Sequence, residues 1–580
     1  MGPEDSARPA PDWARKLLER TLELVAIPDD SAVLLEGSLA EGFGNSGSDV
    51  DFLVVAPGAD ELPTLPAVLF VEGRRVEVRT RSAGQLREQL LRLADGPDED
   101  LLNRCQRFLR AIEIRSGAVD LVDLRALLPY SRFAGVLADW WTARAVQALR
   151  YAVALRALGA RAEAGGWARD GLLQAVKGWA AHRGETYLET KWLPHQLDRL
   201  PPDPLVQRYR ELADPDSWLL EDAERDFGDL RGALGDGRAR LLGEQLTWEQ
   251  VWELAAAFGV TGVADDPHQV LLARLPKITT WTIGERVHVL RADRDVFVLS
   301  ARAARAWRSV VFRRSIREVL DGGAPDSRSE FAAFVRLGLV GLQWRGAGPL
   351  EPALAMCKPL RPSTPVPGGQ TPVLGLTGAA RDDEIATLCP LPADRFTACG
   401  MNVVWSNIVL ENAREDLAGA VADEQGAVAD IAAHRLIAMA VRILLSSFGV
   451  HPLPADVAPL ETVRAILPSD ALRRTDLLTA LEAAQRVRFS RILRAGADPE
   501  AGLALLDDFA GLVRWVAGGG TAAGFPSSFD SREQWSRTLA LSYEWLRLAA
   551  YLDTELPLDE ARDLLTNGGR QPHLRSGGPA

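Results

Sequence analysis

Two short apolar runs joined by a glycine-rich segment constrain this chain more than any other feature of its sequence. The runs are Ala32-Val33-Leu34-Leu35 and Phe52-Leu53-Val54-Val55, and each has the length of a β-strand. Gly37 follows the first run, and the polar segment after it extends as far as Ser48. The pattern predicts a strand, a glycine-rich turn and a second strand.

Two aspartates lie at the start of the second predicted strand. Because residues two apart on a strand point to the same face, Asp49 and Asp51 share one face. Val50 and Phe52 then point to the core. Two carboxylates on one face repel each other unless a cation lies between them. Such oxygen ligands suit Mg²⁺, which takes one or two protein carboxylates and completes its coordination with water and phosphate.

The turn before these aspartates has the composition of a phosphate-binding site. Gly37 lets the backbone approach a phosphate closely, because glycine has no side chain. The Ser38 hydroxyl and nearby N–H groups can donate hydrogen bonds to phosphate oxygens, and Ser48 is a further candidate. A polar turn that only joins two strands would use the same residue types.

A predicted hairpin supplies a third carboxylate. Residues 68–78 form two apolar runs around a turn, as in a β-hairpin. Glu77 lies between Val76 and Val78, so its side chain projects away from the buried valines. A third carboxylate would complete a site for two metal ions, which hold the attacking and leaving oxygens of a phosphoryl displacement. An exposed hairpin glutamate with no such role is the alternative.

This N-terminal pattern resembles the DNA polymerase beta-type nucleotidyltransferase superfamily, and most closely its minimal and small-molecule members. The shared features are a Gly-Ser pair, a step of 12 positions, an Asp-x-Asp pair between hydrophobic runs, and a later carboxylate on a strand. Gly37 and Ser38 match the phosphate-binding pair, and Asp49 and Asp51 match the metal-binding pair. Glu77 matches the third carboxylate.

The resemblance implies a Mg²⁺-dependent enzyme that moves a nucleoside monophosphate from a nucleoside triphosphate to a hydroxyl acceptor. ATP is the expected donor, two Mg²⁺ ions are expected, and pyrophosphate would leave. Asp49, Asp51 and Glu77 would be the catalytic and metal-binding residues. Relatives place a basic residue of a helical domain over the triphosphate, where an ammonium group serves well. Lys191 and Lys177, two of the five lysines, are the candidates, and surface lysines at helix ends are the alternative.

Composition excludes several other classes of protein. A net charge of −13 argues against a protein that mainly binds the nucleic-acid backbone. The four cysteines have no Cys-x-x-Cys spacing, so neither a zinc module nor a disulfide framework is predicted. No apolar run reaches membrane-spanning length, and the polar N-terminus does not have the pattern of a signal peptide. We therefore expect a cytoplasmic protein without a membrane partner.

The middle of the chain predicts a second module of strands and helices. Residues 285–299 alternate around a polar turn, which predicts a β-hairpin. Ser300 and Ser315 are expected to cap two helices, and residues 331–337 to form a third. Residues 339–342 would return as a strand. Hairpin, three helices and strand together predict a winged-helix arrangement.

This module resembles the PqqD-like domain, which binds leader peptides in pathways for ribosomally made, modified peptides. The resemblance rests on Leu299-Ser300, residues 314–319 and residues 334–342, which are mainly apolar positions. It implies that an extended peptide adds to the edge of the sheet. A module used only for packing and a nucleic-acid contact through helical arginines are the alternatives, of which nucleic acid is the less favoured.

The whole chain is predicted to be an α+β multidomain protein. Helical periodicity marks residues 85–127, 133–158, 167–181, 403–420, 427–448, 471–493, 501–516 and 532–553. The predicted units are a nucleotidyltransferase domain with a mixed sheet and helices (1–130), a helical bundle (131–245), a winged-helix, PqqD-like module (246–345), a Pro/Gly-rich linker (346–392), a C-terminal all-α domain (393–566) and a disordered tail (567–580).

The sequence leaves the acceptor open. It could be a ribosomally made peptide held by the winged-helix module, or a small molecule, as in antibiotic-modifying nucleotidyltransferases. The third hypothesis is a catalytically silent protein that binds a nucleotide for regulation.

Overall fold

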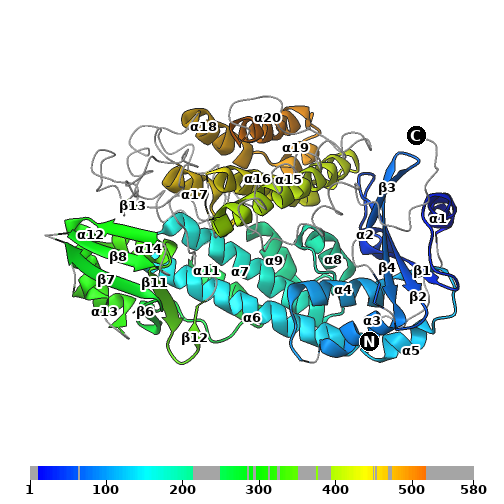
Figure 1. Cartoon of the computed structure of the whole chain (residues 1–580), viewed down its shortest axis with the longest axis horizontal. Coiled ribbons are helices and arrows are strands. Elements are labelled where there is room, and N and C mark those ends of the chain that lie inside the picture. Colours follow the sequence, from blue (N-terminus) through cyan, green and yellow to red (C-terminus); the bar gives the residue numbers. More distant parts are fainter. Residues whose placement is uncertain are drawn as a thin grey trace.

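The computed structural model shows an elongated chain with a mixed sheet at one end, two long helices along the middle, a second α+β module at the other end and a layer of C-terminal helices (Figure 1). The structure describes residues 11–59, 61–62, 66–93, 95–212, 248–283, 286–291, 295–310, 314–322, 327–350, 374–375, 393–448, 450, 453–467 and 473–517.

The N-terminal sheet has five strands in the order β3-β4-β2-β1-β5. Its strands are β1 (Ala32–Glu36), β2 (Val50–Ala56), β3 (Ala67–Val71), β4 (Arg74–Ser82) and β5 (Ile112–Arg115). β2 runs parallel to β4 and antiparallel to β1, and β3 and β4 form the predicted hairpin. The sheet is therefore mixed, as predicted.

Helices cover both faces of this sheet. The face with Val50 and Phe52 packs on α1 (Asp12–Leu24), and both of these side chains are fully buried. The opposite face, with Leu53 and Val55, packs on α3 (Ala83–Arg92) and α4 (Glu99–Arg110). Strands buried on both faces read as continuous apolar runs, which explains the pattern of the two runs in the sequence. Asp51 shares the α4 face with Leu53.

The helix predicted over residues 85–127 is wrong as a continuous element. It divides into α3, α4 and α5 (Leu121–Ala126), and β5 lies between α4 and α5. β5 pairs antiparallel with β1 at the edge of the sheet, and its residues are alternately more and less exposed. Ile112-Glu113-Ile114-Arg115 has the two-residue period of a strand, but a run of four residues is too short to be distinguished from the helical pattern on either side.

Two long helices connect the sheet to the rest of the molecule (Figure 1). They are α6 (Tyr130–Ala157) and α7 (Arg161–His182), joined by a short turn, and both begin before the predicted ranges. One end of α6 packs against the N-terminal domain through Phe133 and Leu137. Shorter elements follow: η1 (Thr190–Trp192), α8 (Leu193–Arg199), α9 (Pro204–Leu212) and α11 (Trp248–Ala257).

The elements predicted for the middle module are present. Ser300 accepts a hydrogen bond from the Ala303 N–H at 3.1 Å, and Ser315 forms a capping box with Glu318. These caps satisfy N–H groups that the first helical turn leaves without partners. The elements are η3 (Pro267–Gln269), β6 (Val270–Arg274), β7 (Ile278–Ile283), β8 (Arg286–Arg291), β9 (Asp295–Leu299), α12 (Ala301–Ser309), β10 (Arg314–Ser315), α13 (Ile316–Asp321), α14 (Arg328–Arg336), β11 (Val340–Trp344) and β12 (Gly348–Pro349).

Strand pairing in this module differs from a single hairpin with a returning strand. The hairpin β8–β9 belongs to a sheet of order β13-β9-β8-β7, whereas the returning strand β11 pairs with β6 in a separate sheet, β10-β6-β11-β12. β13 (Leu374–Gly375) comes from the segment predicted as a linker and runs parallel to β9. The winged-helix and PqqD-like assignments stay predictions.

The C-terminal region is helical over its described residues. α18 and α19 replace the single helix predicted over 471–493, and the chain leaves the helix at Val487 and Arg488 between them. The helix predicted at 532–553 and the predicted tail lie outside the described residues. The helices are α15 (Ala393–Ala422), α16 (Gly426–Ser447), α17 (Pro459–Ile466), α18 (Arg474–Gln485), α19 (Phe489–Arg494) and α20 (Glu500–Ala517).

Within the described ranges, every helix is too short or too polar to cross a bilayer.

Phe52 should be a main determinant of sheet stability. Replacing it with Ala removes a fully buried ring between β2 and α1, and such changes cost about 3–5 kcal/mol. We expect a matching loss of protection for β2 amides in native-state hydrogen exchange. Val122→Ala, at a side chain that is 77% exposed, is the control and should change protection little. Equal effects of the two changes would contradict this description of the core.

Candidate active site

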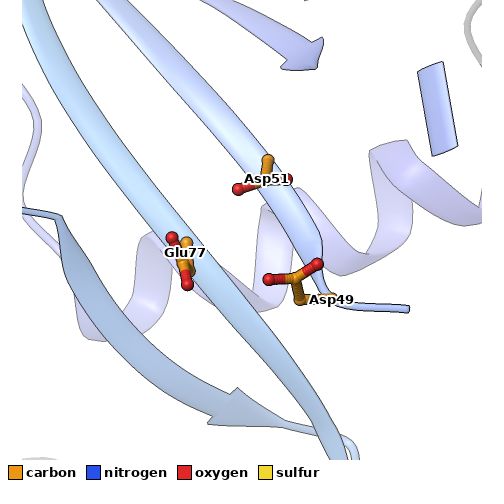
Figure 2. A group of neighbouring side chains, drawn as sticks. All are labelled: Asp49, Asp51 and Glu77. Carbon is orange, nitrogen blue, oxygen red and sulfur yellow. The ribbon is translucent and has the colours of Figure 1, made fainter. Parts of the chain in front are cut away.

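Three carboxylates converge at the edge where β2 begins. Asp49 directly precedes β2, Asp51 lies on β2, and Glu77 is the register partner of Asp51 on the parallel strand β4. Each of the three offers a carboxylate oxygen, and these oxygens lie within 4.8 Å of one another. Figure 2 shows the three side chains grouped on the two neighbouring strands. The structure therefore brings together the three residues predicted to hold metal.

The donor set fits a hard divalent cation. Carboxylate oxygens are the ligands that Mg²⁺ prefers, and its other positions are usually filled by water and phosphate. Asp51 is buried, with 6% of its surface exposed, whereas Asp49 and Glu77 are partly exposed. Asp49 and Glu77 are therefore the members of this group that solvent can reach.

Three arginines surround the carboxylates. Arg75 lies 3.1 Å from Asp49, and Arg79 lies 2.9 Å from Glu77 and 3.8 Å from Asp51. Arg107, on α4, lies 2.6 Å from the Asp51 Oδ2 atom. These guanidinium groups compensate the clustered negative charge, so a cation that enters must compete with them.

Glu36 is a fourth acidic residue of the site and was not predicted. It is the last residue of β1 and the register partner of Asp51, and only 4% of its surface is exposed. Its Oε1 atom accepts hydrogen bonds from Arg79 and Arg107, both at 3.0 Å. Glu36 therefore holds the two arginines in front of Asp51.

The two aspartates have pKa values displaced in opposite directions. Burial, reinforced by the neighbouring Asp49 and Glu77 carboxylates, raises the pKa of Asp51 to about 7, although Arg107 and Arg79 oppose this rise. Burial also acts to raise the pKa of Asp49, but Arg75, Lys191 and Arg107 outweigh it and lower that pKa below its ordinary value. A bound cation would favour the charged form of both.

Gly37 lies directly beside Asp51, Ser38 follows it in the chain, and both residues are buried. Gly37 opens the short helix α2 (Gly37–Glu41) with a φ of 79°, in the left-handed region that favours glycine. A Cβ atom at Gly37 would lie 2.5 Å from the Asp51 Oδ2 atom. The Ser38 carbonyl accepts hydrogen bonds from the N–H groups of Phe43 (2.9 Å) and Gly44 (3.1 Å). The predicted phosphate-binding pair thus adjoins the predicted metal site.

Ser48 is used within its own loop. Its hydroxyl accepts a hydrogen bond from the Asn45 N–H at 3.0 Å, and its own N–H donates to the Asn45 carbonyl at 3.0 Å. Its role in this structure is to close the loop before Asp49, and its predicted contact with nucleotide stays a prediction.

The two lysines have different surroundings. Lys191 lies near the carboxylates: its Nζ atom is 2.6 Å from Asp416 and 3.2 Å from Glu189, and its charge contributes to the low pKa of Asp49. Lys177 is buried in the helical region, where its ammonium group donates to the Gln196 Oε1 atom at 2.7 Å and to the Tyr187 carbonyl. The structure brings Lys191 near Asp49, whereas Lys177 lies apart from the three carboxylates.

Comparison with known families agrees with the geometry. Residues 14–104 match the family model described as a nucleotidyltransferase domain. That span contains the Gly37–Ser38 pair and all three carboxylates, so the N-terminal resemblance is confirmed. No curated protein matches the chain.

Gly37 can be tested against a glycine with the same backbone strain. Gly37→Ala and Gly73→Ala both force alanine into a left-handed conformation, but an added Cβ meets Asp51 only at Gly37 and finds open space at Gly73. We expect Gly37→Ala to lower the affinity for Mn²⁺ by roughly 10-fold, measured by calorimetric titration. Gly73→Ala should bind like the wild type, and equal affinities in both variants would contradict the proposed closeness of Gly37 to the site.

Lys177 should govern stability at alkaline pH. Burial lowers its pKa from 10.5 to about 7, so between these values the unfolded chain binds more protons than the folded chain. The stability contributed by this group therefore rises with pH, by about 2 kcal/mol between pH 7 and 9. Lys177→Met should remove this rise in chemical unfolding experiments, whereas Lys16→Met, at an exposed position, should retain it. A raised KM for nucleotide with an unchanged pH slope would instead support the predicted triphosphate contact.

Proposed function

We propose that this chain is a metal-dependent nucleotidyltransferase that transfers a nucleoside monophosphate from a nucleoside triphosphate to a hydroxyl acceptor. The observation that carries the proposal is the group of three carboxylates within 4.8 Å, placed on adjacent strands of a domain that matches nucleotidyltransferases. ATP as the donor and Mg²⁺ as the metal are part of the proposal, because the all-oxygen donor set suits Mg²⁺ with substrate phosphate.

Asp49, Asp51 and Glu77 would hold the metal ions. Bound Mg²⁺ would supply charge neutralisation for the triphosphate and for the pentacoordinate transition state. Asp51 and Glu77 lie side by side on two paired strands. Their relative position is therefore fixed by the sheet and not by a loop. Such rigidity reduces the reorganisation needed during the reaction.

The triphosphate would lie along the Gly37–Ser38 turn. Gly37 and Ser38 are buried, and Gly37 has no side chain between its backbone and Asp51, so a phosphate oxygen could lie close to this backbone once the side chains around it move aside. Lys191 would approach from the helical side, and it would exchange its bond to Asp416 for one to phosphate. The nucleotide contacts predicted for Ser48 and Lys177 have less support, because Ser48 closes its own loop and Lys177 is buried among Gln196 and Tyr187, away from the carboxylates.

In the chemical step, the oxygen of the acceptor hydroxyl would form a bond to the α-phosphorus in line with the leaving group. The bond between the α-phosphorus and the bridging oxygen would break, and pyrophosphate would leave with that electron pair. The acceptor proton would pass to a carboxylate, for which Glu77 is our candidate. Catalysis would rest on positioning and on charge stabilisation.

For the acceptor, we favour a ribosomally made peptide bound at the middle module. The supporting observation is β7, which forms one edge of its sheet and exposes 61% of Ile283, while β13 already occupies the opposite edge along β9. An extended peptide can add to such an edge through main-chain hydrogen bonds. A small-molecule acceptor is the second candidate, with the middle module used for packing. The cytoplasmic location is a prediction from the sequence.

The central prediction concerns the aspartate pair. Asp49→Asn and Asp51→Asn should each reduce transfer of radiolabelled nucleotide and release of pyrophosphate by at least roughly 1,000-fold, because a neutral amide no longer holds the metal against the triphosphate. Circular dichroism should show an unchanged fold. Asp100→Asn, at a side chain that is 67% exposed, is the matched control. Retained pyrophosphate release in either active-site variant would refute the proposal.

Two further measurements separate the acceptor hypotheses. The full chain is incubated with each nucleoside triphosphate and Mg²⁺, and then with candidate precursor peptides or hydroxylated small molecules. Labelled peptide supports the first candidate, and labelled small molecule supports the second. Nucleotide binding without turnover under all conditions would support a silent regulatory protein.

A further inference from the structure

The loop that leads into Asp49 is bound to the C-terminal helices. Ser46 donates hydrogen bonds to both carboxylate oxygens of Asp423, from its N–H at 2.9 Å and from its hydroxyl at 3.0 Å. Asn45 donates to the Gln425 side chain at 3.2 Å. Asp423 and Gln425 lie in the turn between α15 and α16, so two segments far apart in the sequence meet beside the site.

A pair of glycines permits this contact. A Cβ atom at Gly47 would lie 2.5 Å from the Glu415 carbonyl oxygen, and one at Gly419 would collide with the Asn45 side chain. The backbone of the loop therefore packs directly on the backbone of α15. No side chain could be inserted at either position without moving the loop away from the helix.

The contact reaches Asp49 by two routes. Ser48 ties the loop back to Asn45, so fixing the loop at Ser46 also fixes the backbone that enters β2. Arg75 ties the side chain of Asp49, at 3.1 Å, to α15 through Glu415 at 2.7 Å. Arg75 is nearly buried, with 8% of its side chain exposed, and it also donates to Asn412 at 2.7 Å.

We propose that α15 and the turn after it form a positioning element of the transfer site. Asp423 fixes the loop that carries Asp49, and Glu415 holds Arg75, whose guanidinium group balances the charge of Asp49 until a cation replaces it. The C-terminal helices thus act on metal binding without contributing a metal ligand themselves. This inference rests on the proposed function, because it assigns these contacts to the same metal site.

A role in packing alone makes a different prediction. If the contact only joined two domains, its loss would lower stability and leave the affinity of the intact fold for metal unchanged. If it positions Asp49, its loss should weaken metal binding in a chain that is still folded, since partners of metal ligands orient those ligands.

The test uses two single variants and their combination. Ser46→Ala removes one hydrogen bond from an exposed side chain, and Asp423→Asn replaces one of the two acceptor oxygens with an NH2 group that cannot accept. We expect Asp423→Asn to raise the Mn²⁺ dissociation constant roughly 10-fold, measured without nucleotide by water-proton relaxation. Ser46→Ala should give a smaller rise, and the double variant should resemble Asp423→Asn, because both changes break one interaction.

The control breaks another ion pair of the same helix. Asp507→Asn removes one partner of Arg414, at 2.8 Å, on the side of α15 that faces α20, and Mn²⁺ affinity should stay at the wild-type value. Hydrogen exchange of residues 43–48 supplies an independent readout, and it should be faster in Ser46→Ala and Asp423→Asn only. If Asp423→Asn does not fold, Ser46→Ala still decides the question.

The outcomes separate this inference from the proposed function. Wild-type affinity for Mn²⁺ and wild-type exchange in folded Ser46→Ala and Asp423→Asn would overturn the positioning role, even if the wild type transfers nucleotide. A wild type that binds Mn²⁺ but transfers no nucleotide would overturn the proposed function. The positioning role would then still be judged from the binding and exchange data.

Discussion

Compensation of clustered negative charge is the constraint on which this N-terminal domain depends. Asp51 and Glu77 are neighbours on paired strands, Glu36 faces Asp51 from the other side, and Asp49 lies close by. Without cations, such a group would oppose folding, since buried carboxylates repel one another. Arg75, Arg79 and Arg107 supply the cations in this structure.

The sheet converts a repeating sequence pattern into this arrangement. On β4, Arg75, Glu77 and Arg79 occupy alternate positions and therefore point to one face, between the buried valines. The parallel register of β2 and β4 then sets Glu77 opposite Asp51. The strands thus place acidic and basic side chains at alternating positions of one face. The third arginine of the site, Arg107, comes from α4.

Part of this site could be predicted from the sequence because its signals are local. Asp49 and Asp51 follow from strand periodicity, and Glu77 follows from the same periodicity in the hairpin. Arg75 and Arg79 obey the identical rule and could have been found with it, as could Glu36 at the end of β1. A pattern of metal ligands does not indicate these residues, because in this structure the arginines balance the charge of the ligands and Glu36 pairs with the arginines.

The remaining features depend on tertiary structure. Arg107 lies on a helix whose sequence does not indicate which strand it will cover. Asp423 and Glu415 are more than 300 positions from the residues they hold, as the bond from Ser46 to Asp423 spans 377. In the middle module, local patterns predict the correct elements. The pairing of β11 with β6 joins strands far apart in the sequence, and the alternation of apolar and polar residues does not specify which strands pair.

The length of α6 has a consequence for any tethered substrate. This helix has 28 residues, or roughly 42 Å at 1.5 Å per residue, and it separates the N-terminal sheet from the middle module (Figure 1). A chain anchored on the distant strand β7 would need about a dozen extended residues to cover such a span. The helix would thus set a minimum length for the spacer. A peptide with fewer residues between its anchor and its modified residue could not reach the reacting phosphate.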